Sequence, residues 1–229
     1  MIKIEKTEVF GWEAAIRGMR NPMNSWEKAD SCWEIINTDD YEIGYEPIIE
    51  FVVGENDLSL MKRLAKAGSD HGKFLRMINV TIDITAPLYW WKEFDTYKVG
   101  TVANSCSTMH KIHAKEFTLD DFSYEHLLVP DKLGLIIDWL NTYRQIYMEY
   151  EDGMTDVDGQ PLTKKDIWWQ MIQLLPSSYN QKRTVQLNYQ VLKSMYHARK
   201  NHKLDEWRKF CAWCESLPYF NDLCIGSDD

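Results

Sequence analysis

Residues 76–85 alternate between apolar and polar side chains, and this pattern constrains the fold of the chain more than any other. In an extended strand, successive side chains point to opposite faces, so alternation places the apolar ones together on one face. That face would carry Ile78, Val80, Ile82 and Ile84. We therefore predict a strand with one buried face at residues 76–85, and a sheet to which it belongs.

Shorter strands and helices are predicted around this strand in the first half of the chain. Residues 2–10 predict an edge strand, and the apolar run at residues 48–53 predicts another strand. Helices are predicted at residues 12–19, at residues 56–67 and, after Pro87, at residues 88–94. Asn56 or Asp57 would cap the second of these helices, and Gly68 would end it. Residues 95–109 are predicted to form a loop.

The second half of the chain has the periodicity of helices. Helices are predicted at residues 119–127, 131–149, 164–174 and 205–216, and Thr163 would cap the third of them. The longest helix is predicted to begin near Asn180, after Pro176, and to continue towards Trp207. Its buried stripe would consist of Val185, Leu187, Val191, Leu192, Met195 and Ala198. Without an internal repeat or an obvious linker, we expect one domain, residues 1–229, with a strand-containing half at 1–110 and a mainly helical half at 111–229.

Charge and hydropathy exclude several classes of partner. The net charge of −9 argues against binding a nucleic-acid polymer, because phosphate neutralisation requires clustered Lys and Arg. A single nucleotide is compatible with that charge. No apolar run approaches the ~20 residues of a membrane span. The first residues, MIKIEKTEVF, lack the order of a signal peptide, so we expect an intracellular, cytoplasmic protein.

The five cysteines are odd in number and widely spread, which does not indicate a disulfide framework. Cys211 and Cys214 form a C-x-x-C, but neither a second such pair nor nearby paired histidines complete a zinc site. We therefore predict no metal site and interpret these two cysteines as small buried side chains.

Two blocks of the sequence resemble the flavin-dependent thymidylate synthases. In the first block, the family has a helix ending in Gly-His, an alternating strand, and an Ala-Pro-like corner. His71, Ala86 and Pro87 occupy these places here. In the second block, the family has a Leu-Pro, then an Asn and then an Arg, and the spacing of Pro176, Asn188 and Arg199 reproduces it.

The resemblance implies a fold, an activity and a set of ligands. The fold would be α/β (α+β), a small antiparallel sheet flanked by helices with a helical C-terminal half, as in the thymidylate synthase-complementing proteins. The family methylates dUMP with FAD, methylenetetrahydrofolate and NADPH, and it assembles as a homotetramer with sites between subunits. The partners implied for this chain are thus a pyrimidine nucleotide, FAD and further copies of the chain.

The resemblance also implies roles for individual residues. Arg199 takes the position of the family's catalytic arginine, which contacts the pyrimidine. The flavin side of the site would be formed by His71, Thr96, Tyr97, Lys98, Asn104, Asn188, Gln190 and Ser194. The nucleotide side would be formed by Glu93, Thr96, Thr101, Ser105, Cys106, Thr108 and Arg199.

The chain departs from the family where phosphate contacts are expected. The family's Arg-His-Arg-x-x-Ser signature is replaced by Thr-Tyr-Lys-Val-Gly-Thr at residues 96–101. Each lost Arg removes a bidentate, charge-assisted contact, and Lys98 returns only a point charge. Two alternatives stay open: a divergent member that binds a pyrimidine nucleotide and FAD and carries out a C5 methyl or one-carbon transfer, or a non-catalytic interaction or regulatory protein on the same scaffold.

Overall fold

The computed structural model describes residues 1–35 and 49–226, and the chain divides into two compact units. Unit 1 comprises Met1–Glu5, Asp83–Thr96 and Ala103–Val185, and unit 2 comprises Lys6–Ile82, Tyr97–Val102 and Gln186–Asp229. Four strands form an antiparallel sheet in the order β1 (Lys3–Phe10), β4 (Asn79–Pro87), β6 (Asn180–Asn188) and β5 (Val102–Ser105), so β1 is an edge strand as predicted. The expectation of a single domain at residues 1–229 stays a prediction.

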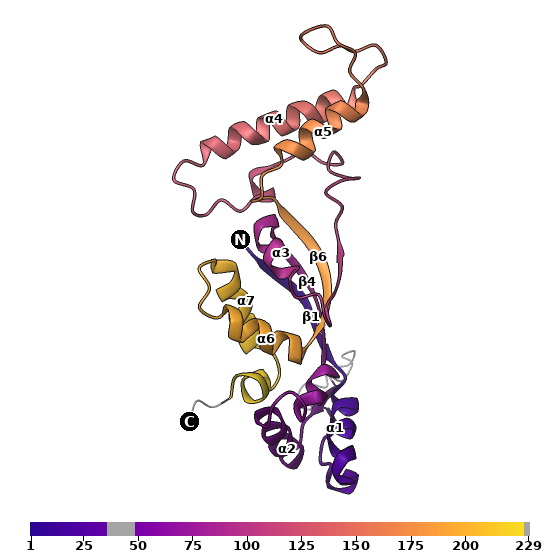
Figure 1. Ribbon diagram of the computed structural model, residues 1–229, viewed down its shortest axis with the longest axis vertical. Helices are drawn as coiled ribbons and strands as arrows, with labels where there is room; N and C mark the ends of the chain where they lie inside the picture. Colours follow the sequence, from indigo (N-terminus) through magenta and orange to yellow (C-terminus); the bar gives the residue numbers. More distant parts are fainter. Residues whose placement is uncertain (36–48, 227–229) are drawn as a thin grey trace, which may run out of the picture. The chain divides into compact units, whose positions relative to one another are not determined.

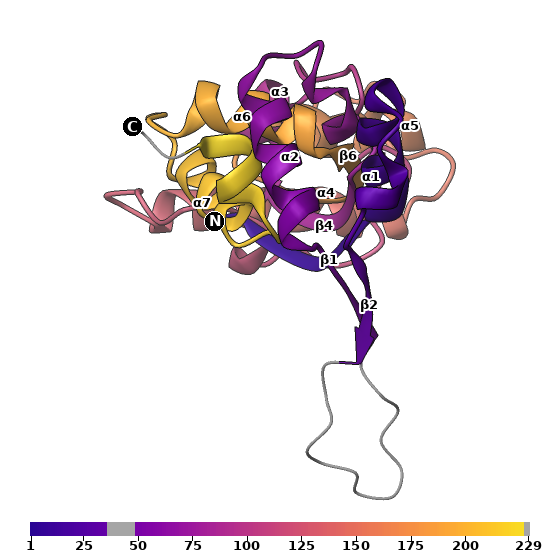
Figure 2. The same cartoon turned by 90° about the horizontal axis from the view of Figure 1, so that it is seen from below.

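Most helices of the first half of the chain belong to unit 2 (Figure 1). The elements, in chain order, are β1 (Lys3–Phe10), α1 (Trp12–Arg20), two short 3₁₀ turns (Asn21–Met23 and Trp26–Lys28), β2 (Cys32–Ile35), β3 (Ile49–Val52), α2 (Glu55–Lys66) and a 3₁₀ turn (Gly72–Arg76). Strands β2 and β3 pair in antiparallel register, with Cys32 opposite Val52 (Figure 2). Residue 48, where the second of these strands was predicted to begin, lies outside the described residues.

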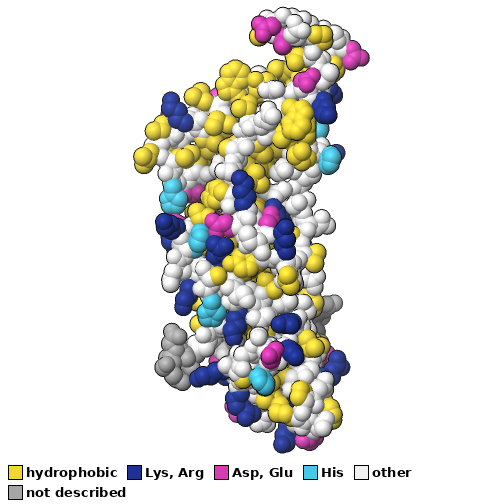
Figure 3. Space-filling model, in the orientation of Figure 1, with side chains coloured by type: hydrophobic (Ala, Val, Ile, Leu, Met, Phe, Trp, Pro, Cys, Tyr) yellow, Lys and Arg dark blue, Asp and Glu magenta, His cyan; other side chains and the backbone are white. Residues whose placement is uncertain are grey.

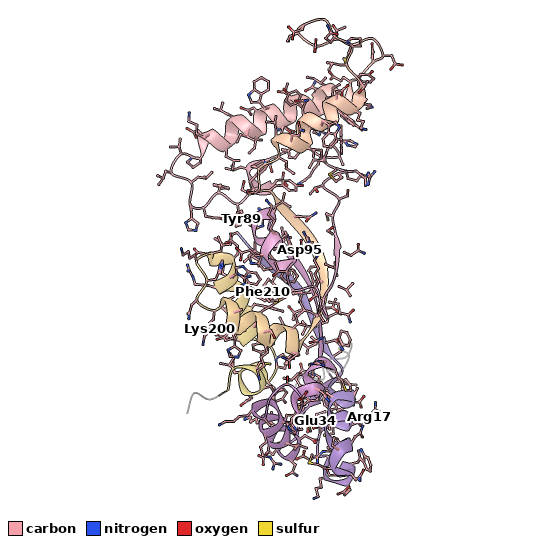
Figure 4. The ribbon with its side chains drawn as sticks, in the orientation of Figure 1. Arg17, Glu34, Tyr89, Asp95, Lys200 and Phe210 are labelled. Atoms are coloured by element: carbon pink, nitrogen blue, oxygen red, sulfur yellow. The ribbon has the colours of Figure 1, made fainter. Side chains whose placement is uncertain are left out.

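The C-terminal part of unit 2 is helical. It contains α6 (Tyr189–Arg199), α7 (Asp205–Glu215) and a single π-helical turn (Asn221–Ile225). Figure 4 shows Lys200 directly after α6 and Phe210 on α7. Phe210 is fully buried, and the α6 residues Leu192 and Met195 are buried as well.

Unit 1 contains the longest helix and its own core. Besides parts of β1, β4 and β6, its elements are α3 (Leu88–Phe94), most of β5 (Val102–Ser105), a 3₁₀ turn (Leu119–Asp121), α4 (Asp131–Met148) and α5 (Lys164–Leu174). Helices α4 and α5 lie side by side (Figure 1). One core cluster of this unit is formed by Ile112, Phe117, Phe122, Leu133, Ile137, Leu140 and Met171.

Strand β4 (Asn79–Pro87) confirms the alternating segment, although it begins later than predicted. Val80, Ile82 and Ile84 are completely buried along it, and the intervening side chains are half-buried. Ile78 is also buried but precedes the strand. The period of two therefore located both the strand and its buried face.

The prediction of one helix from Asn180 to Trp207 is wrong. Residues Asn180–Asn188 form strand β6, and a helix begins only at Tyr189. Val185 and Leu187 are buried while Gln186 between them is exposed, which is the period of a strand. Pairing with other strands of the sheet satisfies the backbone of this segment, so tertiary context overrides the helical pattern.

Three further local predictions are wrong. The helix predicted at residues 119–127 is one 3₁₀ turn, closed by a capping box between Thr118 and Asp121. The loop predicted at residues 95–109 contains strand β5. Helix α2 is capped from a distance, because the Asp30 carboxylate accepts hydrogen bonds from the amides of Asn56 (2.8 Å) and Asp57 (3.0 Å). By contrast, the predicted cap of α5 by Thr163 is confirmed.

Within the described ranges, none of the helices has the length and apolar character that crossing a membrane requires.

Candidate functional site

The end of α6 carries Arg199 against two aromatic side chains of unit 2. The Arg199 Nε donates a hydrogen bond of 2.9 Å to the hydroxyl of Tyr97. The guanidinium carbon lies 4.9 Å from the ring centroid of Trp207 and 5.6 Å from that of Tyr97. We call Tyr97, Arg199 and Trp207 the Arg199 cluster. A cation over aromatic faces at these distances is attracted by the ring quadrupoles, which fixes the direction of the guanidinium.

The segment 97–102 also contacts the start of α6. Asn188 caps that helix, since its side-chain oxygen accepts a hydrogen bond from the amide of Val191 (3.1 Å). Gly100 has a φ of +77°, and a Cβ at this position would lie 3.0 Å from Val191 Cγ2 and 3.1 Å from Asn188 Nδ2. Glycine is therefore required here both by conformation and by the close approach. The altered signature segment thus meets α6 at Asn188 and at Arg199.

Thr101 carries unused hydrogen-bonding capacity in the same segment. Its hydroxyl oxygen is buried and has no hydrogen-bond partner among the described residues. A buried hydroxyl without a partner is costly, because its desolvation is not compensated. A ligand or water bonded to this hydroxyl would remove that cost. The lack of a partner for the Thr101 hydroxyl is therefore evidence in favour of a polar ligand.

The other flavin-side residues predicted in unit 2 are less closely gathered. The Ser194 hydroxyl donates to the Gln190 carbonyl (3.0 Å), so these two residues lie one turn apart on α6. His71 is exposed and immediately precedes the turn Gly72–Arg76, and Lys98 is exposed as well. Of the predicted residues in this unit, Tyr97 and Arg199 are in direct contact, and Asn188 lies at the opposite end of α6, beside Gly100.

The remaining predicted residues belong to unit 1, where several of them hold the local backbone. The Thr96 hydroxyl donates to the Glu93 carbonyl (2.7 Å) at the end of α3. Asn104 and Ser105 lie exposed on β5. The Cys106 amide donates to the Lys182 carbonyl (2.9 Å), and the Cys106 carbonyl accepts from the buried Gln181 side chain (2.8 Å).

Cys106 and Thr108 also line a cleft of about 460 Å³ in unit 1. Two cations in its wall are paired with acids: Lys182 lies 2.9 Å from Asp83, and Lys115 is bonded to Asp121. The pairing with Asp83 raises the pKa of Lys182. These lysines are therefore partly neutralised by their acidic partners.

The two cysteines of the C-x-x-C motif in α7 belong to the buried core. Cys211 and Cys214 are both buried, and burial raises the pKa of Cys211 to about 11. A thiol with so high a pKa is a poor nucleophile and a poor metal ligand at neutral pH. Over residues 1–35 and 49–226, no group of three or more His, Cys, Asp or Glu side chains is placed to hold a metal ion.

Two residues of this site were not predicted to be functional from the sequence. Trp207 forms one side of the Arg199 cluster, and Gly100 permits the approach of segment 97–102 to α6. A glycine between Val99 and Thr101 was a visible signal for a special backbone conformation. Nothing in the local pattern around Trp207 indicated a contact with Arg199.

Comparison with known proteins defines the class of fold. No protein family model matches the sequence, and no curated protein sequence matches it. The fold is that of the flavin-dependent thymidylate synthases, a mixed α/β fold with a small antiparallel sheet, as predicted.

A structure of Thymidylate Synthase X (ThyX) from Helicobacter pylori with FAD and dUMP aligns with 98% of this chain and 97% of its own, at a TM-score of 0.66 and 13% sequence identity. A structure of the flavin-dependent thymidylate synthase ThyX from Helicobacter pylori complexed with FAD and dUMP covers 97% of both chains, at a TM-score of 0.62 and 14% identity. The likeness extends over the whole chain and concerns the fold.

Proposed function

We propose that this protein binds a pyrimidine nucleotide of the dUMP kind together with FAD, as a divergent homologue of the flavin-dependent thymidylate synthases. The observation that carries the proposal is the packing of segment 97–102 on α6, where Tyr97 contacts Arg199 at the end of the helix and Gly100 approaches Asn188 at its start. The resemblance gives each of these positions a contact with nucleotide or flavin. Both solved relatives in fold contain FAD and dUMP, which supports the same ligand class here.

The residues of segment 97–102 and α6 are chemically suited to the proposed ligands. The Arg199 guanidinium can bind the oxygens of a pyrimidine or stabilise negative charge on them. The buried Thr101 hydroxyl has no hydrogen-bond partner among the described residues and can bond a ligand, and Tyr97 and Gln190 would hold polar edges of the flavin. FAD, when bound, supplies the hydride transfer on which a C5 methyl or one-carbon transfer depends.

A second candidate function is supported by the way the same residues are used. The Arg199 Nε is already bonded to Tyr97, and the Thr96 hydroxyl is bonded to the end of α3. Polar groups engaged in this way can have a purely structural role, since a fold can be retained after its functional site is lost. On that reading the protein is a non-catalytic interaction or regulatory module.

Bound flavin and ligand-induced stabilisation distinguish the two candidates. Freshly purified protein is expected to show the visible absorption bands of flavin. Addition of dUMP at about a hundred times its Kd is expected to stabilise the protein by ~2.7 kcal/mol, which raises the Tm by roughly 5–10 °C for a chain of this size.

Deoxyadenosine monophosphate is the matched control, because it keeps the phosphate and the sugar but replaces the pyrimidine. Colourless protein that releases no flavin on denaturation and gives no thermal shift with dUMP rejects the proposal. An equal shift with both nucleotides rejects the preference for pyrimidines.

The proposed assembly is a homotetramer, as the resemblance implies, and the surface of α4 supports an assembled state. Leu133, Ile137 and Leu140 bury one face of this helix, yet Leu135 and Trp139 are 56% and 57% exposed. Figure 3 shows hydrophobic side chains gathered on the surface over α4 and α5. A helix that is apolar on more than one side is usually covered by another surface.

Substitution of Trp139 by glutamate is therefore expected to shift the protein to a smaller assembly, because a buried unpaired carboxylate opposes association. Light scattering coupled to size-exclusion chromatography gives the mass of each species. Val157, fully exposed outside the helices, offers a control as Val157→Glu. An unchanged mass for Trp139→Glu contradicts a role for this face in assembly.

A further inference from the structure

A basic pocket of about 370 Å³ lies within unit 1, apart from the residues assigned above. It is lined by His110, His113, Tyr147, Lys164, Lys165 and Trp168, together with Met109. Two hydrogen bonds join its walls: the Trp168 indole donates to the Met109 carbonyl (2.8 Å), and the Arg144 Nε donates to the His113 carbonyl (3.0 Å). Segment 109–113, the end of α4 and the start of α5 are thereby held together around the pocket.

The charge of this pocket is of one sign. Two lysines and two histidines contribute to its lining, which contains no carboxylate among the described residues. The nearby carboxylate of Asp166 is engaged in the capping box of α5, where it accepts from the amide of Thr163 (2.8 Å) and from its hydroxyl (2.5 Å). In a protein of net charge −9, this is a local reversal of the average charge.

The positions of Lys164 and Lys165 are not those expected for lysines with a purely structural role. Lys164 and Lys165 open α5, and cations near a helix N-terminus are disfavoured by the helix dipole. Lys164 is nevertheless held there, with its ammonium 4.8 Å from the ring centroid of Tyr147. An anion in the pocket would be attracted by both the lysines and the dipole.

His113, which lines the same pocket, provides an independent observation. Its Nδ1 is buried and has no hydrogen-bond partner among the described residues, and its ring lies 4.5 Å from that of Tyr147. Burial, and then the positive charges of Lys111, Lys164 and Arg144, lower the pKa of this imidazole. Among the described residues, the groups that shift this pKa include no acid, so the wall lacks the counter-charge that an anionic ligand would supply.

We propose that this pocket binds the phosphate group of a small phosphorylated ligand. The lysines at the start of α5 would contact the oxygens directly, and the imidazoles of His110 and His113 would offer hydrogen bonds to them. This inference does not depend on the proposed nucleotide and flavin site, because it uses none of the residues of the Arg199 cluster.

Inorganic pyrophosphate is the probe for the test, titrated by calorimetry at constant ionic strength. Lys164→Ala/Lys165→Ala is expected to weaken binding at least tenfold. The matched control is Lys62→Ala/Lys66→Ala, which removes two lysines from a different cleft, in unit 2, and is expected to change the Kd less than twofold. Arg199→Ala is expected to leave pyrophosphate binding unchanged, which separates this pocket from the nucleotide site.

Absence of pyrophosphate binding to the unaltered protein overturns the proposal, as does equal weakening by both double variants. A second measurement needs no substitution. The imidazole NMR signals of His113 are expected to move on addition of pyrophosphate, while those of the exposed His71 stay in place. Unmoved His113 signals in the presence of bound pyrophosphate would place the anion elsewhere and equally overturn it.

Discussion

Replacement of Arg20 by methionine is expected to lower the free energy of unfolding by about 3–5 kcal/mol, because it leaves the buried carboxylate of Asp57 without its ion-pair partner. The Arg20 Nε lies 2.7 Å from Asp57 Oδ1, and the two side chains are 4% and 0% exposed. The other guanidinium nitrogens donate to the carbonyls of Ser25 (3.1 Å) and Lys28 (2.9 Å). Methionine roughly keeps the volume and loses all of these contacts.

Urea unfolding followed by circular dichroism measures this difference. Arg17→Met is the matched control, since Arg17 belongs to the same helix α1 and is exposed. It is expected to change the free energy of unfolding by no more than about 0.5 kcal/mol. Equal destabilisation by the two substitutions would show that the Arg20–Asp57 pair has no special role.

The pH dependence of the same variant gives a check with a definite sign. Burial alone would raise the pKa of Asp57, but hydrogen bonds from Ser31, Arg20 and the Asp30 amide outweigh it and lower that pKa. The stabilisation is therefore complete above the ordinary aspartate pKa of about 3.9 and is lost as the pH falls through the lowered folded value. The difference between Arg20→Met and the unaltered protein should narrow in acid, because protonation removes the unpaired charge.

The partners in the Arg20–Asp57 ion pair could not be predicted from local sequence patterns. Asn56 or Asp57 was expected to cap α2, a role that their positions near the start of the helix suggested. Instead Asp30 caps the helix, and the Asp57 carboxylate accepts from Ser31 (2.6 Å) and Arg20. These contacts join residues far apart in the chain, and no periodicity encodes such partners.

Patterns that depend on neighbouring residues were predictive. The alternation of Val80, Ile82 and Ile84 identified the buried face of β4, and Thr163 with Asp166 closes the predicted start of α5. Strand β6 was predicted as helix because Val185 and Leu187 also fit a helical stripe when read with Val191 and Leu192. Only pairing with other strands of the sheet decides between the two, and that pairing is non-local.

At the candidate site, too, spacing along the chain was informative, while contacts between distant segments could not be predicted. The spacing of Pro176, Asn188 and Arg199 led to the correct fold, yet it could not identify Trp207 as a partner of Arg199. Asn188 was predicted inside a helix, and it proves to be the last residue of β6 and the N-cap of α6. Its contact with Gly100 arises from the packing of a separate segment on α6.

Arg199→Lys is expected to weaken dUMP binding roughly tenfold to 150-fold, as follows from losing a hydrogen bond of ~1.5–3 kcal/mol to a charged group. Lysine keeps the positive charge, so the loss would come from the planar, forked geometry of the guanidinium and its stacking on Trp207. Calorimetry well below the Tm gives the Kd. Arg208→Lys, at an exposed arginine of α7, is the control and is expected to leave the Kd unchanged.

Tyr97→Phe separates ligand binding from scaffolding at the same place. It keeps the ring against Arg199 but removes the hydroxyl that accepts the 2.9 Å hydrogen bond. If Arg199 binds the nucleotide, this substitution should weaken dUMP binding less than Arg199→Lys, because the guanidinium remains. If Arg199 serves only to join α6 to segment 97–102 and α7, both substitutions should lower the Tm and leave dUMP binding, where it is present, unaltered. That second outcome would favour the non-catalytic module, because the family's catalytic position would then have become part of the core.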